Sequence, residues 1–122
     1  MQIQKTKKDD VDIAVINSDV PIIFDVPSSL DLIMTVIYDT GCTRLAINKE
    51  AFTENFFILS TGLAGEILQK FINYGIKAAI YGDFSKYTSK PLKDFMYESN
   101  HGKDLFFQDD YSKAVEKLSA AK

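Results

Sequence analysis

From residue 28 to the end of the chain, short apolar runs alternate with longer stretches whose apolar residues recur at helical spacing. The short runs span residues 44–48, 76–81 and 105–107, and the helical stretches begin near residues 28, 62, 89 and 110. Strands that alternate with helices of this length usually pair in parallel through right-handed crossovers. The pattern therefore predicts an α/β fold with a mainly parallel sheet.

The segment before residue 28 predicts a hairpin. Residues 11–16 alternate as a strand does, Asn17-Ser18-Asp19 supplies turn residues, and residues 22–24 form a second short apolar run. The first eight residues are polar, and we expect them to be loosely held. With the hairpin included, the predicted order is β-β-α-β-α-β-α-β-α, a mixed sheet with flanking helices.

Local signals predict where the helices begin and end. Ser28 and Asp31 have the spacing of a capping box, so the first helix is expected to begin there and to end at Gly41. Ser89 is the expected cap of the third helix, with Pro91 in its first turn. The expected inward face of the first helix consists of Leu30, Ile33, Met34 and Ile37.

Composition limits the domain count, the compartment and the partners. The chain has 122 residues, of which 46% are apolar and 25% charged, which predicts one soluble domain over residues 1–122. No run approaches the ~20 apolar residues that span a bilayer, and no signal-peptide core follows Met1, so we expect a cytoplasmic protein without a membrane partner. The net charge of -3 argues against nucleic acid as a partner.

Two stretches of the chain resemble a known family. Residues 82–100, which begin Gly-Asp-Phe-Ser-Lys-Tyr-Thr-Ser, and residues 61–71, Thr-Gly-Leu-Ala-Gly-Glu-Ile-Leu-Gln-Lys-Phe, are similar to a bacterial family known only as domain of unknown function 4180. The resemblance covers nearly the whole chain. It implies no activity, because the family has none assigned.

The order of elements is also similar to that of the STAS domain, the fold of bacterial anti-sigma factor antagonists. Those proteins bind a partner kinase and are switched by phosphorylation at the start of their second helix, in an Asp-Ser-Ser-Gly-like motif. The matching place in this chain is Leu59-Ser60-Thr61-Gly62-Leu63. The resemblance implies a phosphorylatable Thr61, although Ser60 stands where that family has an acidic residue.

Three interpretations of Ser60 and Thr61 remain open. Either residue could be a regulatory phosphorylation site, because a helix N-terminus favours a phosphate group. Either could instead be a helix cap, or part of a ligand site. Gly62 and Gly65 would allow close approach of an anion or close packing of a helix, but they lack the Gly-Lys-Ser/Thr ending of a phosphate loop.

Polar residues follow two of the predicted parallel strands. Ligands in open α/β sheets bind beyond the carboxyl ends of the strands, so these residues are expected to form a strand-end rim. The candidate ligand-binding residues of this rim are Glu50, Thr61, Gly62, Asp83, Ser85 and Lys86, with Asn48 and Lys49 beside them. The rim could be an ordinary solvated edge, a binding site, or a place where Glu50 and Asp83 act as paired carboxylates in acid–base catalysis.

The remaining side chains that could bind a metal or a partner also have structural interpretations. One histidine, His101, and one cysteine, Cys42, cannot form a standard Cys/His zinc site, so we expect no metal and no cofactor. Phe56, Phe57 and Tyr87 are candidates for an exposed patch used in self-association or partner binding, with core packing as the alternative.

The sequence thus favours a protein-binding or regulatory module over an enzyme, with Thr61 as a candidate switch. We expect a homodimer, formed through the aromatic residues or through the edge of the hairpin. The alternative is a small-molecule-binding protein or an enzyme that uses the rim around Glu50, Thr61 and Asp83.

Overall fold

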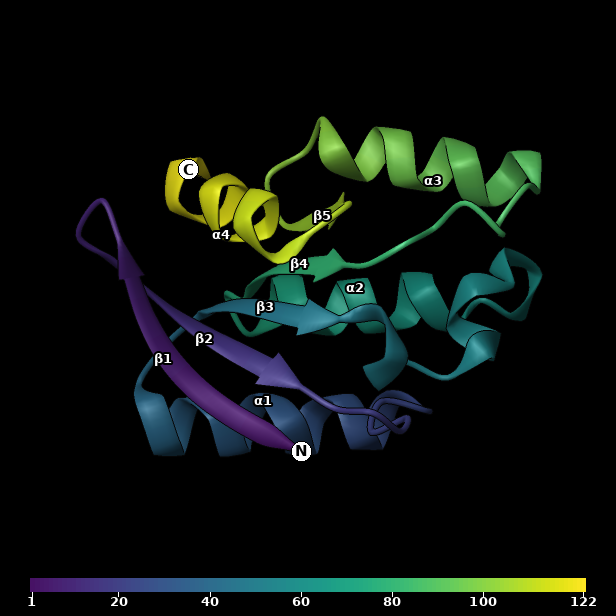
Figure 1. Ribbon diagram of the computed structural model, residues 1–122. Helices are drawn as coiled ribbons and strands as arrows, with labels where there is room; N and C mark the ends of the chain where they lie inside the picture. Colours follow the sequence, from purple (N-terminus) through teal and green to yellow (C-terminus); the bar gives the residue numbers. More distant parts are fainter.

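The computed structural model, which describes residues 1–122, contains a five-stranded sheet whose strands lie in chain order (Figure 1). The strands are β1 (Gln2–Lys8), β2 (Val11–Asn17), β3 (Arg44–Asn48), β4 (Lys77–Tyr81) and β5 (Leu105–Gln108). The α-helices are α1 (Val26–Thr40), α2 (Leu63–Asn73), α3 (Lys90–Asn100) and α4 (Tyr111–Ala120). β1 is antiparallel to β2, and β2 to β5 are parallel. The predicted α/β class with a mixed, mainly parallel sheet is therefore confirmed.

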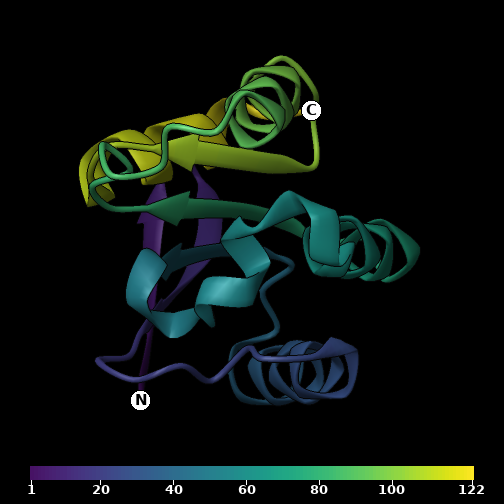
Figure 2. The same cartoon turned by 90° about the vertical axis from the view of Figure 1, so that its right-hand side faces the viewer.

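The helices cover the two faces of the sheet unequally. Figure 2 shows α1 and α2 on one face and α4 on the opposite face. The larger core lies between the sheet and the helices α1 to α3, whereas the smaller core lies beneath α4. Residues on β3 and β4 are buried on both sides, as strands between two helical layers must be. Leu45 lies opposite Ala78 and Ile47 opposite Ile80, so the predicted pairing of these central strands is confirmed.

The predicted N-terminal hairpin is right in one strand and wrong in the other: residues 11–16 lie in β2, but the partner strand is β1 rather than residues 22–24. The first eight residues, expected to be loosely held, form β1, which turns through Asp9 and Asp10 into β2. Both turn residues have positive φ, 51° and 64°, which matches the right-handed twist of a two-residue hairpin. Residues 22–24 contribute only an isolated bridge between Ile23 and Phe52. β1 is an edge strand and contributes only Ile3 to the core boundary, so its sequence carries almost no apolar alternation.

The first helix begins earlier than expected. Asp25 is its N-cap and accepts a hydrogen bond from the backbone N–H of Ser28 at 2.8 Å. In return, the Ser28 hydroxyl accepts a hydrogen bond from the backbone N–H of Asp25 at 3.1 Å, which completes a capping box. Ser28 therefore occupies the third helical position rather than the cap, and Asp31 is exposed. The face that packs on the sheet also differs from the expected one: Ser29, Leu32, Ile33 and Val36 are buried, whereas Met34 is exposed. The stop at Gly41 and the caps of the later helices, Ser89 and Asp110, agree with the local signals.

Three short 3₁₀ helices connect β3 to α2. They are η1 (Lys49–Ala51), η2 (Glu54–Phe57) and η3 (Leu59–Thr61). Phe56 and Phe57 are 0% and 3% exposed, and they pack edge to face at 5.1 Å within the larger core. Their predicted place on an exposed patch is therefore wrong, because the connection folds back over the sheet and buries them. None of the helices has the length and apolar character needed to cross a bilayer.

Candidate functional site

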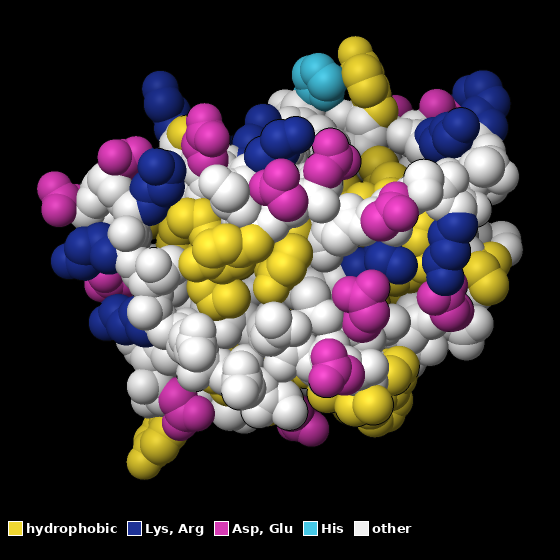
Figure 3. All heavy atoms as spheres, in the orientation of Figure 1, with side chains coloured by type: hydrophobic (Ala, Val, Ile, Leu, Met, Phe, Trp, Pro, Cys, Tyr) yellow, Lys and Arg dark blue, Asp and Glu magenta, His cyan; other side chains and the backbone are white.

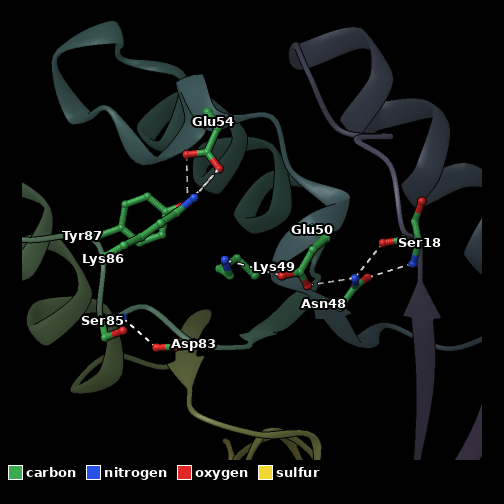
Figure 4. A network of polar contacts seen from close by, with 9 residues as sticks. All are labelled: Ser18, Asn48, Lys49, Glu50, Glu54, Asp83, Ser85, Lys86 and Tyr87. Atoms are coloured by element: carbon green, nitrogen blue, oxygen red, sulfur yellow. Dashed lines mark hydrogen bonds and ion pairs between the residues drawn. The ribbon is translucent and has the colours of Figure 1, made fainter.

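The polar residues that follow β3 and β4 lie together at the carboxyl ends of these strands (Figure 4). Asn48 ends β3, and Lys49 and Glu50 follow it in η1. Asp83 and Ser85 lie in the loop after β4, which runs beside η1 because the two strands are neighbours in the sheet. This part of the strand-end rim thus assembles where the sequence predicted it.

Lys49 occupies the centre of the rim. Its side chain is only 14% exposed, and its Nζ lies 3.5 Å from Glu50 Oε2 and 5.7 Å from the centre of the Tyr87 ring. Gly82 packs directly against the aliphatic stem: a Cβ added there would lie 2.9 Å from the Cβ of Lys49. Gly82 also has a φ of 152°, so only glycine fits without strain. The close approach of the two loops therefore depends on this glycine.

Asn48 connects the rim to Ser18, the residue that follows β2. Its side chain is 7% exposed and makes two hydrogen bonds to the backbone of Ser18. The amide accepts from the Ser18 N–H at 2.9 Å and donates to the Ser18 carbonyl at 2.7 Å, and it also donates to Glu50 Oε1 at 3.3 Å. A buried amide that uses both of its donors and its carbonyl oxygen in hydrogen bonds holds its loop in one position. We assign Asn48 a structural role in orienting Glu50.

A second cluster joins η2 to the β4–α3 loop. The Tyr87 hydroxyl donates to the carboxylate of Glu54, with its oxygen 3.0 Å and 3.1 Å from the two carboxylate oxygens, and Lys86 Nζ lies 3.1 Å from the same carboxylate. The Tyr87 ring stacks on Phe57 at 4.7 Å. Sequence reasoning missed Glu54, because its partners lie 32 and 33 residues further along the chain. The only available signal was an acidic residue inside an aromatic run.

The carboxyl groups of the rim favour their ionised forms. Slight burial raises the pKa of Glu54, but the hydrogen bonds from Lys86 and Tyr87 outweigh burial and the net pKa is lowered. Burial likewise raises the pKa of Glu50, and its hydrogen bonds and Lys49 reverse the effect. Hydrogen bonds from Ser85 lower the pKa of Asp83. The lowered pKa values favour the ionised forms of Glu50 and Asp83, whereas a general acid is more effective when its pKa is raised toward the working pH.

An open groove of about 390 Å³ lies between the η2–η3 segment and the start of α3. Ser60 and Phe57 line one side, and Lys86, Tyr87 and Pro91 line the other. We call it the η3–α3 groove. Ser60 and Lys86 both line this groove, whereas Thr61 and Gly62, which were expected in the rim, do not line it. The rim and the groove are thus neighbouring features joined by Lys86 and Tyr87.

Thr61 is not the N-cap of α2. Gly62 holds that position with a φ of 79°, and no side chain caps the helix from it. The Thr61 hydroxyl oxygen instead lies 2.9 Å from the carbonyl oxygens of both Asn55 and Ile58, which share its single hydrogen, and it accepts from the Leu63 N–H at 3.3 Å. Thr61 therefore fastens η2 to η3 while remaining exposed.

The other singled-out residues have structural environments. Gly65 is exposed and has open space around it, so the expected close helix packing is absent there. Cys42 is buried at the end of α1. His101 lies at the C-terminus of α3, with Nδ1 2.8 Å from the Tyr97 carbonyl oxygen. No group of three or more His, Cys, Asp or Glu side chains is arranged to hold a metal ion.

Comparisons with known proteins give one match. No curated protein and no solved structure matches the chain. The model of one family, described as Domain of unknown function (DUF4180), matches residues 8–118. Because the match spans nearly the whole chain, including the rim, the groove, α1 to α3 and most of α4, the protein belongs to this family.

Proposed function

We propose that this protein is a protein-binding regulatory module whose contact surface is the strand-end rim together with the η3–α3 groove. The observation that carries the proposal is the place of Thr61. Its exposed hydroxyl fastens η2 to η3 through the carbonyls of Asn55 and Ile58, and η2 supplies the Glu54 carboxylate that holds Tyr87 and Lys86. A change at Thr61 would therefore act directly on the shape of this surface.

Phosphorylation of Thr61 is the proposed switch. An esterified oxygen has no hydrogen to donate, so both contacts to the carbonyls would be lost, and a dianion beside carbonyl oxygens would be repelled. The N-cap Gly62 supplies no side chain, and the Leu63 N–H makes only a long hydrogen bond of 3.3 Å, to Thr61 Oγ1 itself. The first N–H groups of α2 would therefore donate to the phosphate, near the positive end of the helix. The phosphate would thus move away from η2 and release one wall of the groove.

The topology favours a protein partner over a small-molecule substrate. In doubly wound sheets, the ligand crevice opens where the strand order reverses and successive helices pass to opposite faces. In this sheet β2 to β5 follow one another without a reversal, so no such crevice opens at the rim. The mixed charges of this surface fit the polar margin of a protein interface, because Lys49 and Lys86 lie among the carboxylates of Glu50 and Asp83 in the rim and of Glu54 beside it. Figure 3 shows the same interleaving of positive and negative side chains over one face of the molecule.

A small-molecule-binding protein or enzyme is the second candidate. The observation that favours it is the volume of the groove, about 390 Å³, which lies within the range of ligand pockets. A compound that copurifies with the protein and shifts the NMR signals of Ser60, Lys86 and Tyr87 would support it.

Paired variants test the switch. Thr61→Glu and Thr61→Ala both remove the fastening hydroxyl, so amide exchange in residues 54–58 is expected to rise in both. Thr61→Ser keeps the donor and Ser60→Ala removes a hydroxyl without a hydrogen bond, so these controls keep the wild-type exchange. Thr61→Glu is expected to be the more stable of the first two, because its charge gains about 0.3–1 kcal/mol at the start of α2.

A second experiment tests partner binding and uses the protein isolated from the cells that naturally produce it. Mass spectrometry is expected to find phosphate on Thr61, and a copurifying protein that Thr61→Ala retains and Thr61→Glu loses. If both variants retain that protein equally, or if Thr61 is never phosphorylated, the switch is wrong. Cell fractionation tests the cytoplasmic location that this proposal includes.

A further inference from the structure

We propose that the open edge of β1 is a second binding surface, which accepts an extended acidic segment of another protein as a sixth strand of the sheet. The two edges of the sheet differ in their accessibility. At the β5 edge, the Phe107 N–H donates to Asn100 Oδ1 at 2.7 Å, so a side chain from α3 already occupies a backbone group there. β1 pairs only with β2 over its seven residues, and Figure 1 shows no element beyond it. An exposed edge of this length is a template for an added strand.

The charges on β1 define the partner. Lys5 and Lys7 point to the same face of the sheet, and both rely on one carboxylate, that of Asp12, at 3.7 Å from each. Their side chains are about half exposed or more, which leaves them free to meet a second carboxylate. Opposite charges placed directly across two strands stabilise their pairing. Acidic residues two positions apart on the incoming strand would therefore pair with the two lysines.

The amino end of β1 adds an apolar requirement. A pocket of about 270 Å³ lies between Met1 and the start of α1, with Phe24 and Leu32 in its lining. Ile3 faces the same side of the sheet as Lys5 and Lys7, so the residue opposite Ile3 would point toward this pocket. An antiparallel strand would thus read acid–x–acid–x–apolar from its N-terminus, opposite Lys7, Lys5 and Ile3 in turn.

A second copy of this chain fits the edge less well. The symmetric antiparallel register that uses the whole of β1 places Lys5 directly opposite Lys5 of the other copy. Like charges in that position destabilise a strand pair, and lysines on an edge strand are a known protection against self-pairing. The edge therefore discriminates against its own copy and in favour of an acidic strand.

The probe is the peptide acetyl-Thr-Glu-Thr-Glu-Val-Ile-Thr-amide, titrated into the full-length protein and followed by NMR. We expect shifts and slowed amide exchange in β1, and binding about fivefold tighter than that of the same peptide with lysine in place of glutamate. Two further peptides, N-methylated at alternate residues in opposite phase, separate main-chain pairing from charge attraction. One phase removes the N–H groups that face β1 and is expected to abolish binding, while the other phase retains it.

Charge exchange completes the test. The Lys5→Glu/Lys7→Glu variant is expected to prefer the lysine peptide, and Lys5→Gln/Lys7→Gln to lose the preference, which keeps the test valid if the first variant does not fold. The proposal is overturned if no peptide binds, if both N-methylated peptides bind alike, or if the charge of the peptide makes no difference. It is also overturned if β1 becomes protected as protein concentration rises without any peptide, because a second copy would then occupy the edge.

Discussion

At the scale of single residues, Gly82 and Gly65 differ in whether a side chain fits at their position. Gly82 has a φ of 152° and contacts the stem of Lys49, whereas Gly65 lies in α2 with nothing near the position of a Cβ. We predict that Gly82→Ala lowers the free energy of unfolding by about 1–3 kcal/mol, because the new methyl group must displace Lys49 and the backbone is strained. Gly65→Ala is the control and is expected to raise the same quantity by about 0.5–1 kcal/mol. Urea unfolding measures both, and equal effects would contradict the contact at Gly82.

The pKa of Glu54 tests the cluster that joins η2 to the β4–α3 loop. Tyr87→Phe and Lys86→Met each remove a hydrogen bond that lowers this pKa, so the pKa is expected to rise toward the ordinary value of 4.5. NMR titration of the Glu54 carboxyl measures the change. Lys90→Met is the control, because Lys90 pairs with Asp94 on α3 and not with Glu54. An unchanged pKa in the first two variants would show that the cluster does not form in solution.

The lowered pKa of Glu54 also predicts how the stability of the fold depends on pH. A carboxyl whose folded pKa lies below 4.5 stabilises the fold fully above that pH and loses its contribution as the pH falls through the folded pKa. The unfolding free energies of wild type and Glu54→Gln are therefore expected to differ most at neutral pH and to converge as the pH falls well below 4.5. The difference stays below about 1 kcal/mol, because the Glu54 side chain is 65% exposed and solvent screens its contacts.

At the scale of elements, the start of α1 distinguishes two caps that are close in sequence. Asp25 accepts the Ser28 N–H, while Asp31 is exposed and makes no hydrogen bond. We predict that Asp25→Ala lowers the free energy of unfolding by about 1 kcal/mol, whereas Asp31→Ala changes it by less than about 0.5 kcal/mol. Thermal or urea unfolding compares the two variants. A larger loss from Asp31→Ala would restore the later helix start expected from the sequence.

Elements were predictable where the local signal and the core agreed. β3 and β4 are continuous apolar runs, and both are buried on two sides, so their sequences carry the full hydrophobic signal. α3 and α4 begin at Ser89 and Asp110, whose side chains accept backbone hydrogen bonds as helix caps do. β1 was missed because an edge strand that touches the core through Ile3 alone needs no apolar alternation.

Self-association belongs to the scale of the whole molecule and stays a prediction. Of the two expected contact surfaces, Phe56 and Phe57 are buried and the hairpin edge is β1 with its lysines. Apolar side chains remain exposed on and before α1, where Phe24 is 57% and Tyr38 is 90% exposed. Large exposed apolar side chains can contribute to an interface between proteins. Phe24 and Tyr38 therefore offer a different surface for a dimer.

We therefore expect a homodimer at micromolar concentration that Phe24→Asp and Tyr38→Asp together convert to a monomer. Tyr97→Asp is the control, since Tyr97 is 67% exposed but lies on α3. Sedimentation velocity over a concentration series measures the outcome. A wild-type protein that stays monomeric at the highest concentration would refute the dimer, and dissociation by the control variant would refute the surface.

The sequence by itself determined the α/β class, the central parallel strands and the location of the polar rim. Apolar periodicity and helix caps are local properties, and the carboxyl ends of neighbouring parallel strands must meet at one edge. Tertiary structure alone decided the role of Thr61, the partners of Glu54 and the strand character of residues 2–8. Each of these depends on how residues 49–61 fold over the sheet or on which strand lies at its edge. Such pairings between distant segments arise from packing, and no pattern within a short window of sequence encodes them.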